Sequence, residues 1–186
     1  MYTGERHAGT LSAFVAIAGI LLATGLDPTF SWTGDALSDL GVRDSSNAVF
    51  NGALLIAGVL GVVYGVGLFR VADGIREQLV AVMFALATVH LAGVGLFVIG
   101  HPLHLPAAIG FYLLVTITFI VDGIIRRRSR WGRYTLLLAA LQLLIWSSWI
   151  IGLWPGNGLA LPEFAGALLV PLWIYFVGPA PTLIDR

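Results

Sequence analysis

The stretch AVFNGALLIAGVLGVVYGVGLFR, residues 48–70, carries no charged side chain before its terminal arginine. The hydrocarbon core of a bilayer is about 30 Å thick, and a helix of roughly 20 apolar residues crosses it. The stretch is apolar around the whole circumference of such a helix, as expected where the solvent is lipid. Residues 48–70 therefore predict a membrane-spanning helix, and the rest of the chain repeats the pattern.

The composition indicates an integral membrane protein. Of its 186 residues, 58% are hydrophobic and 11% are charged, whereas a soluble domain has about 25% charged residues. So few charges cannot cover the surface of a soluble protein of this length. The chain has no cysteine, which excludes disulfides, thiolate metal ligands and a cysteine nucleophile. Its formal net charge is zero, which argues against nucleic acid as a partner and leaves the lipid bilayer.

Six apolar segments are long enough to span a bilayer and are bounded by charged or turn-forming residues. They predict an all-α fold, an integral membrane six-helix bundle that forms a single transmembrane domain over residues 1–186. The predicted helices cover residues 10–27, 48–70, 78–100, 104–125, 133–154 and 161–178. Small residues let helix backbones approach closely in lipid. The glycines expected at such contacts are Gly58, Gly61, Gly65, Gly67, Gly93, Gly95 and Gly100.

The links between the helices differ in charge. Arginines gather in the link between the second and third helices and in RRRSRWGR, residues 126–133, between the fourth and fifth. Cytoplasmic links carry an excess of basic residues, so these links and both termini, with Arg6 and Arg186, are predicted to be cytoplasmic in a multi-pass protein of the cell membrane. The other links then face outward. An alternative for the first segment is a signal peptide with the small residues 23–25 at its cleavage site; continuation of the helix to Asp27 favours a retained span.

The outward links hold the residues that could carry chemistry. In GDALSDLG, residues 34–41, Asp35 and Asp39 are four apart in what reads as a short helical turn, so both carboxylates are expected to face one way. The other outward links add two imidazoles and a carboxylate: His101, His104 and Glu163. The candidate ligands of a divalent metal ion are Asp39, His101, His104 and Glu163, and the candidate catalytic residues are Asp35, Asp39, His101 and His104. The alternative is that these side chains only solvate the links and cap helices.

Two ionisable side chains lie within predicted spans, where the cost of burial makes a functional role the first hypothesis. They are His90 in the third span and Asp122 near the inner end of the fourth. Arg126 follows Asp122 by four residues, so an ion pair on one helix face explains the carboxylate. For His90 we expect a hydrogen bond to a neighbouring helix. Haem binding is the less favoured alternative, because it requires a second axial histidine on a facing helix.

The segment ALSDLGVRDSSNAVFNGALLIAG, residues 36–58, resembles a signature of the membrane protein family known as domain of unknown function 998 (DUF998). The matching elements are Ser38-Asp39-Leu40-Gly41, after the first helix, and Phe50-Asn51, which opens the second. The family also tends to carry a histidine-containing segment before the fourth helix, matched here by His101-Pro102 and His104. The resemblance implies a six-helix topology with Ser38, Asp39, Gly41 and Asn51 as signature residues, and it implies no reaction.

Three functions fit these residues. The first is a non-enzymatic membrane component that assists, senses or stabilises a partner, either another membrane protein or a second copy of the chain, because glycine-rich helices favour association. In this hypothesis the outward links form an ordered polar cap over the bundle. The second is a membrane-embedded metal-dependent hydrolase or lipid-modifying enzyme that uses Asp35, Asp39, His101 and His104. The third is a small transporter with His90 and Asn51 in its path. The sequence contains no phosphate-binding glycine loop, nucleophile elbow or zinc-protease motif.

Overall fold

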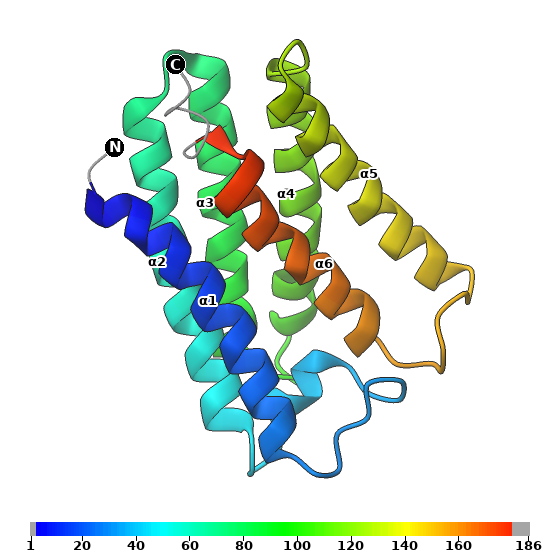
Figure 1. Ribbon diagram of the computed structural model, residues 1–186. Helices are drawn as coiled ribbons and strands as arrows, with labels where there is room; N and C mark the ends of the chain where they lie inside the picture. The colour runs from blue at the N-terminus through cyan, green and yellow to red at the C-terminus, as the bar shows by residue number, and fades with distance from the viewer. Residues whose placement is uncertain (1–2, 180–186) are drawn as a thin grey trace.

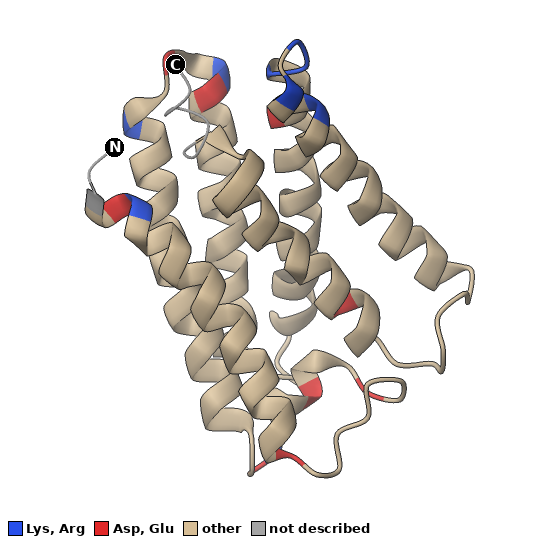
Figure 2. Cartoon of the chain, viewed as in Figure 1, with Lys and Arg blue, Asp and Glu red and all other residues tan. Residues whose placement is uncertain are grey.

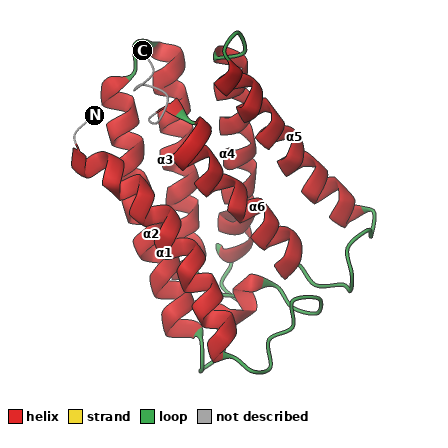
Figure 3. Ribbon diagram, in the orientation of Figure 1, coloured by secondary structure: helices red, strands yellow, loops and turns green. Residues whose placement is uncertain are grey.

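The structure is a computed structural model, and it describes residues 3–179. This part of the chain consists of helices and loops and contains no strand (Figure 1, Figure 3). The helices are α1 (Thr3–Leu26), the 3-10 helix η1 (Leu37–Gly41), α2 (Asn47–Val71), α3 (Ile75–Leu96), α4 (His104–Ile125), α5 (Arg130–Ile150), α6 (Ala160–Leu172) and the π-helical turn η2 (Trp173–Val177). Arg186 lies outside the described residues.

Six of these elements are long and apolar enough to cross a membrane, α6 together with η2. The prediction of a multi-pass membrane protein with six helices is therefore confirmed. α2 and α4 begin and end within one residue of their predicted ranges, whereas α1 begins at Thr3 rather than at residue 10.

Two helices end earlier than predicted. α3 ends at Leu96 and α5 at Ile150, rather than at residues 100 and 154. Gly100 and Gly152 follow these ends with φ angles of 95° and 76°, a left-handed conformation that glycine adopts readily and through which a helix does not continue. A Cβ atom on Gly100 would meet nothing within 4 Å, so the prediction that this glycine lies at a helix contact is wrong.

Consecutive helices pack against one another from α1 to α5, and α6 contacts α1, α4, α5 and η1 (Figure 1). The links of residues 27–46, 97–103 and 151–159 lie at one end of the bundle, the acidic end. The links of residues 72–74 and 126–129 lie at the other, the arginine end, where most of the arginines gather (Figure 2). The alternation of links thus places polar residues from three distant segments at the acidic end.

Glycines bring α2 and α3 into backbone contact. A Cβ atom on Gly58 would lie 2.6 Å from the carbonyl oxygen of Thr88 and 2.7 Å from the backbone nitrogen of Ala92, both on α3. A Cβ atom on Gly95 of α3 would lie 2.6 Å from the carbonyl oxygen of Asn51 on α2. The close contacts predicted at Gly58 and Gly95 are therefore confirmed, and they matter because lipid provides no hydrophobic drive for helices to associate.

η1 belongs to the core rather than to the surface. Leu40 of η1 is fully buried, and with Leu37 it packs in one cluster with Ile20 of α1 and Phe50 of α2. A second cluster surrounds Trp173, which is also fully buried. The link between α1 and α2 therefore folds back into the end of the bundle.

Candidate functional site

Arg43 joins two carboxylates at the acidic end. Its Nη1 atom lies 3.0 Å from Asp27 Oδ2, and its Nη2 atom lies 3.0 Å from Asp35 Oδ2. The same Asp35 oxygen accepts a hydrogen bond of 2.8 Å from the backbone N–H of Ser31. A guanidinium suits such a bridge, because its planar fork presents donors to two partners at once. Through Arg43, Asp35 therefore ties the link of residues 27–46 to Asp27, at the end of α1.

Asp27 is the buried member of this bridge. Its Oδ1 atom accepts hydrogen bonds from the hydroxyl of Thr29 at 2.7 Å and from the backbone N–H of Thr29 at 2.9 Å. These bonds, chiefly the one from the hydroxyl, lower the pKa of Asp27 below its ordinary value, and Arg43 adds to the shift while burial opposes it. Asp27 in turn raises the pKa of Arg43. Each partner thus favours the charged form of the other.

Two further carboxylates hold the start of η1. Asp39 Oδ2 accepts a hydrogen bond of 2.8 Å from the backbone N–H of Ala36, and Glu163 Oε2, on α6, accepts one of 2.7 Å from the backbone N–H of Leu37. Asp35 lies before η1 begins at Leu37. The prediction that Asp35 and Asp39 share one face of a helical turn is therefore wrong, because only Asp39 belongs to the turn and the two carboxylates have different partners.

Backbone hydrogen bonds join the link of residues 27–46, between α1 and α2, to the link of residues 151–159 and the start of α6. The carbonyl oxygen of Thr33 accepts a hydrogen bond of 2.9 Å from the backbone N–H of Gly158, and that of Asp35 accepts bonds of 2.9 Å from Leu159 and Ala160. A Cβ atom on Gly158 would lie 2.5 Å from the carbonyl oxygen of Asp35, so the approach requires a residue without a side chain. These bonds also satisfy N–H groups at the start of α6 that have no partner inside the helix.

Two side-chain hydrogen bonds, one of them from the signature residue Asn51, fix η1 to the beginning of α2. The Nδ2 atom of Asn51 donates a hydrogen bond of 2.8 Å to the carbonyl of Gly41, and the hydroxyl of Ser46 donates one of 2.9 Å to the carbonyl of Leu40. A Cβ atom on Gly41 would lie 2.6 Å from Asn51 Oδ1, so a side chain there would displace the amide. Ser38 is buried. The pairing of Gly41 with Asn51 gives the signature a structural explanation.

His101 lies in the link of residues 97–103, and His104 is the first residue of α4. Both histidine side chains are hydrogen-bonded to backbone groups of this link. His104 Nδ1 donates a hydrogen bond of 2.7 Å to the carbonyl of Phe97. The His101 ring stacks on Phe97, with centroids 4.7 Å apart, and its Nδ1 atom accepts a bond of 3.1 Å from the N–H of Leu103. Among residues 3–179, no three or more histidine, aspartate or glutamate side chains are grouped so that they could hold a metal ion. The four predicted metal ligands are thus not brought together.

His90 packs at the contact between α3 and α4. Its Nδ1 atom donates a hydrogen bond of 2.8 Å to the carbonyl of Leu86. The expected bond to a neighbouring helix is therefore wrong, because the partner lies one turn earlier on α3 itself. The ring fills a notch at Gly110 of α4, where a Cβ atom would lie 2.6 Å from His90 Nε2.

Asp122 joins α4 to η2. Arg126 Nε donates a hydrogen bond of 2.6 Å to Asp122 Oδ1, so the ion pair expected from their spacing is present. Trp173 Nε1 donates a bond of 2.8 Å to Asp122 Oδ2. Arg126 also donates to the hydroxyl of Thr135 at 3.1 Å and to the carbonyl of Val177 at 2.8 Å. Sequence reasoning missed Trp173, because a tryptophan near a membrane boundary gives no signal of its buried partner.

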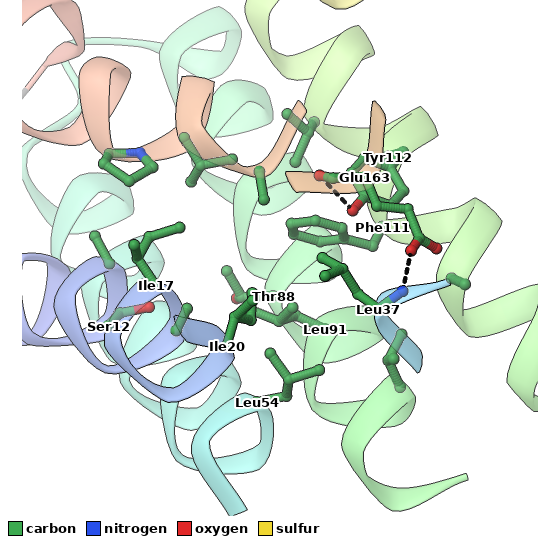
Figure 4. Close-up of a pocket in the computed structure, with 18 of the residues that line it drawn as sticks. Ser12, Ile17, Ile20, Leu37, Leu54, Thr88, Leu91, Phe111, Tyr112 and Glu163 are labelled. Carbon is green, nitrogen blue, oxygen red and sulfur yellow. Dashed lines mark hydrogen bonds between the residues drawn. The ribbon is translucent and has the colours of Figure 1, made fainter. Parts of the chain in front are cut away.

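A cavity lies inside the bundle beside η1. Its volume is about 70 Å³, and its walls come from α1, η1, α2, α3, α4 and α6. Figure 4 shows Ser12 and Ile17 of α1 on one side of the space and Tyr112 and Glu163 on the opposite side. Alanines on three helices leave room between the larger side chains: Ala13, Ala16, Ala108 and Ala167. Sequence reasoning did not find this site, because alanines in an apolar span carry no signal of a shared space.

Three of the hydroxyl groups in the cavity wall are already bonded to the protein. Each donates to a backbone carbonyl: Ser12 to Ala57 at 2.7 Å, Thr88 to Ala85 at 2.9 Å and Tyr112 to Glu163 at 2.9 Å. Glu163 supplies the one carboxylate of the wall, and η1 holds one of its oxygens (Figure 4). The surface offered to an occupant is therefore mainly methyl groups and aromatic rings.

A model of the family described as protein of unknown function (DUF998) matches residues 10–179 of the chain. The match extends from the first turns of α1 to the end of the described residues. No curated protein and no solved structure matches the chain.

Proposed function

The chain belongs to the DUF998 family, and because the description of that family assigns no function, we propose one from the geometry. The protein is a non-catalytic membrane component that binds the end of an apolar chain, such as the acyl tail of a lipid, inside its helical bundle. It acts as a sensing or accessory subunit for another membrane protein or for a second copy of itself. The observation that carries the proposal is the apolar cavity beside η1. At the acidic end this cavity is closed by η1 and the carboxylates of Asp35, Asp39 and Glu163 that hold it in place, which we call the cap.

The size of the cavity limits the ligand. An apolar cavity of about 150 Å³ stays dry and binds benzene, so a volume of about 70 Å³ has room for only a few carbon atoms. The end of a chain fits, whereas a whole lipid does not. Affinity then comes mainly from dispersion contacts with the wall, because the hydroxyls of Ser12, Thr88 and Tyr112 are already bonded to backbone carbonyls.

The ligand enters between α1 and α6. Ile17 of α1 and Val170 and Pro171 of α6 line the cavity and are only half-buried, which places its mouth between these two helices. Pro171 has no N–H to donate to the carbonyl of Ala167, one turn earlier in the cavity wall. α6 is thereby less constrained at this turn, and a chain end can enter from the lipid while the cap stays closed.

The cap favours a structural role for the acidic residues. Asp35 and Asp39 bind Arg43 or backbone N–H groups, and Glu163 binds η1. Carboxylates committed in this way fix η1, which supplies Leu37 and Ser38 to the cavity wall. The cap therefore shapes the cavity, and no reaction is needed to explain the acids.

The experiment compares two alanine-to-leucine substitutions. Ala167 lies in the cavity wall, whereas Ala140 is exposed on α5 and lines no part of the cavity. In proteoliposomes that contain a phospholipid with a photoreactive group at the end of its acyl chain, we expect labelling of α1 and α6 peptides. Ala167→Leu should abolish this labelling and Ala140→Leu should preserve it. Equal labelling of the two variants would refute the proposal.

A metal-dependent hydrolase that uses Asp35, Asp39, His101 and His104 is the second hypothesis. Its test is elemental analysis of protein purified without chelator. A stoichiometric metal ion that is lost in His104→Ala would establish the site. We expect no such ion, because Asp39 and His104 are bonded to backbone groups within their own links.

A transporter is the third hypothesis. Neither His90 nor Asn51 lines the cavity, so the predicted path does not coincide with the space inside the bundle. Solute flux into proteoliposomes that is abolished by Asn51→Ala and His90→Phe would support this function over the others.

We further propose that the arginine end is cytoplasmic, with both termini on that side of the cell membrane, since cytoplasmic links carry an excess of arginine. The chain has no cysteine, so single cysteines can report its orientation. His101 and Arg128 are exposed at opposite ends. On intact cells, His101→Cys should react with a membrane-impermeant maleimide and Arg128→Cys should not. The reverse result would invert the orientation.

A further inference from the structure

Three arginines line one hollow at the arginine end of the bundle. Arg76 belongs to the first turn of α3, and Arg127 and Arg128 lie in the link between α4 and α5. The hollow has a volume of about 490 Å³, and Ile124 and Ile125, at the end of α4, complete its wall. Arginines from the start of α3 and from the link between α4 and α5 thus line a space with an apolar side.

The charges around this hollow are not compensated within residues 3–179. The ion pairs of the described chain use other arginines: Arg43, Arg70 and Arg126. Two acids lie close to Arg76 in the sequence, Asp73 in the link before α3 and Glu77 in the first turn of α3, and neither lines the hollow. Glu77 Oε2 instead accepts a hydrogen bond of 2.6 Å from the backbone N–H of Asp73. Three positive charges therefore face the space without a carboxylate in its wall.

The position of the hollow matches the chemistry of a phospholipid. It lies where membrane-spanning helices end, which is the depth of lipid headgroups. Arginine binds phosphate oxygens through two parallel N–H donors. Ile124 is 50% exposed, so an acyl chain can lie along α4 while the headgroup meets the guanidinium groups.

We propose that this hollow binds the phosphate of an anionic phospholipid headgroup, held by Arg76, Arg127 and Arg128, with an acyl chain against Ile124 and Ile125. The site shares no residue with the cavity beside η1, so it is independent of the function proposed above. Inorganic phosphate offers the same anion without the chain. The two isoleucines in the wall are the reason for assigning the lipid.

The test measures retention of phosphatidylglycerol and of phosphatidylcholine by the purified full chain, using native mass spectrometry. Each arginine near a membrane surface contributes about fivefold to the binding of an anionic lipid, so removal of three should weaken binding on the order of 100-fold. We expect this loss of phosphatidylglycerol in Arg76→Gln/Arg127→Gln/Arg128→Gln, with little change in phosphatidylcholine. The exposed positions of these side chains leave the fold intact, and each single variant should lose about fivefold.

A matched triple variant removes the same charge elsewhere at this end. Arg6, Arg130 and Arg133 are exposed and do not line the hollow. Arg6→Gln/Arg130→Gln/Arg133→Gln should keep most of the phosphatidylglycerol. An equal loss in both triples would show attraction to a diffuse surface charge and would overturn the site. Displacement of the lipid by millimolar inorganic phosphate would overturn its assignment to a lipid headgroup.

Discussion

The contact of α2 with α3 predicts opposite effects for one substitution at two positions of the same helix. Gly52 and Gly58 both lie on α2, and alanine stabilises a helix relative to glycine by about 0.5–1 kcal/mol. At Gly52, an added Cβ atom would meet nothing within 4 Å. Gly52→Ala should therefore leave the free energy of unfolding unchanged or raise it by up to this amount.

At Gly58, the added Cβ atom would lie 2.6 Å from the Thr88 carbonyl oxygen and 2.7 Å from the Ala92 nitrogen. Optimal separations between non-bonded heavy atoms are about 3.5–4.0 Å, so the backbone of α3 must move by about 1 Å. Such overpacking costs about 1–3 kcal/mol, which exceeds the gain in helix propensity. We expect Gly58→Ala to lower the free energy of unfolding by about 1–2 kcal/mol net.

The assay is thermal unfolding of both variants in one detergent, followed by circular dichroism, with the wild-type chain as reference. The two variants share chemistry, helix and solvent, so their difference isolates the contact with α3. Equal shifts for Gly52→Ala and Gly58→Ala would refute the argument that backbone proximity holds α2 against α3.

Two further predictions concern buried polar groups. The pKa of Asp27 is lowered by Thr29 and Arg43, so its contribution to stability is present above the ordinary aspartate pKa and is lost as the pH falls through the lowered value. When unfolding is followed from neutral pH to well below the ordinary aspartate pKa, the wild-type chain should lose stability more steeply than Asp27→Asn in the part of the range below that pKa, and parallel curves there would contradict this. Gln142 is fully buried, and neither atom of its amide has a hydrogen-bond partner within residues 3–179. Gln142→Leu should therefore raise the free energy of unfolding by about 1–3 kcal/mol, because an unsatisfied polar group is removed; a loss of stability would show that the amide has a bound partner.

The helix ends show where sequence reasoning worked and where it failed. The spans at α2 and α4 could be predicted closely, because a long apolar run bounded by polar or charged residues indicates transfer into lipid directly. The ends of α3 and α5 could not be placed, since apolar residues continue into the links and only the backbone conformation, at Phe97 after α3 and at Gly152 after α5, ends the helices. Hydropathy does not distinguish a helical apolar residue from one in the link that follows.

The side chains in the link of residues 27–46 also show what could be predicted from the sequence and what could not. The sequence of this link indicated that Asp35 and Asp39 lie close together, and proximity in the chain was enough for that inference. Their partners could not be predicted, because Glu163 reaches Leu37 across 126 positions of sequence. The signature residues Gly41 and Asn51 were identified by resemblance, and their mutual contact explains them only once η1 is seen against α2.

The sequence by itself determined that the chain has six helices long and apolar enough to cross a membrane and that it belongs to its family, because hydropathy and a local signature are properties of neighbouring residues. The tertiary structure alone decided which groups the acids of the cap bind, that alanines on three helices enclose a cavity, and that three arginines share a hollow. The physical reason is that these features depend on which faces of distant helices meet. In lipid, small residues and backbone packing decide those meetings, and hydropathy does not record them.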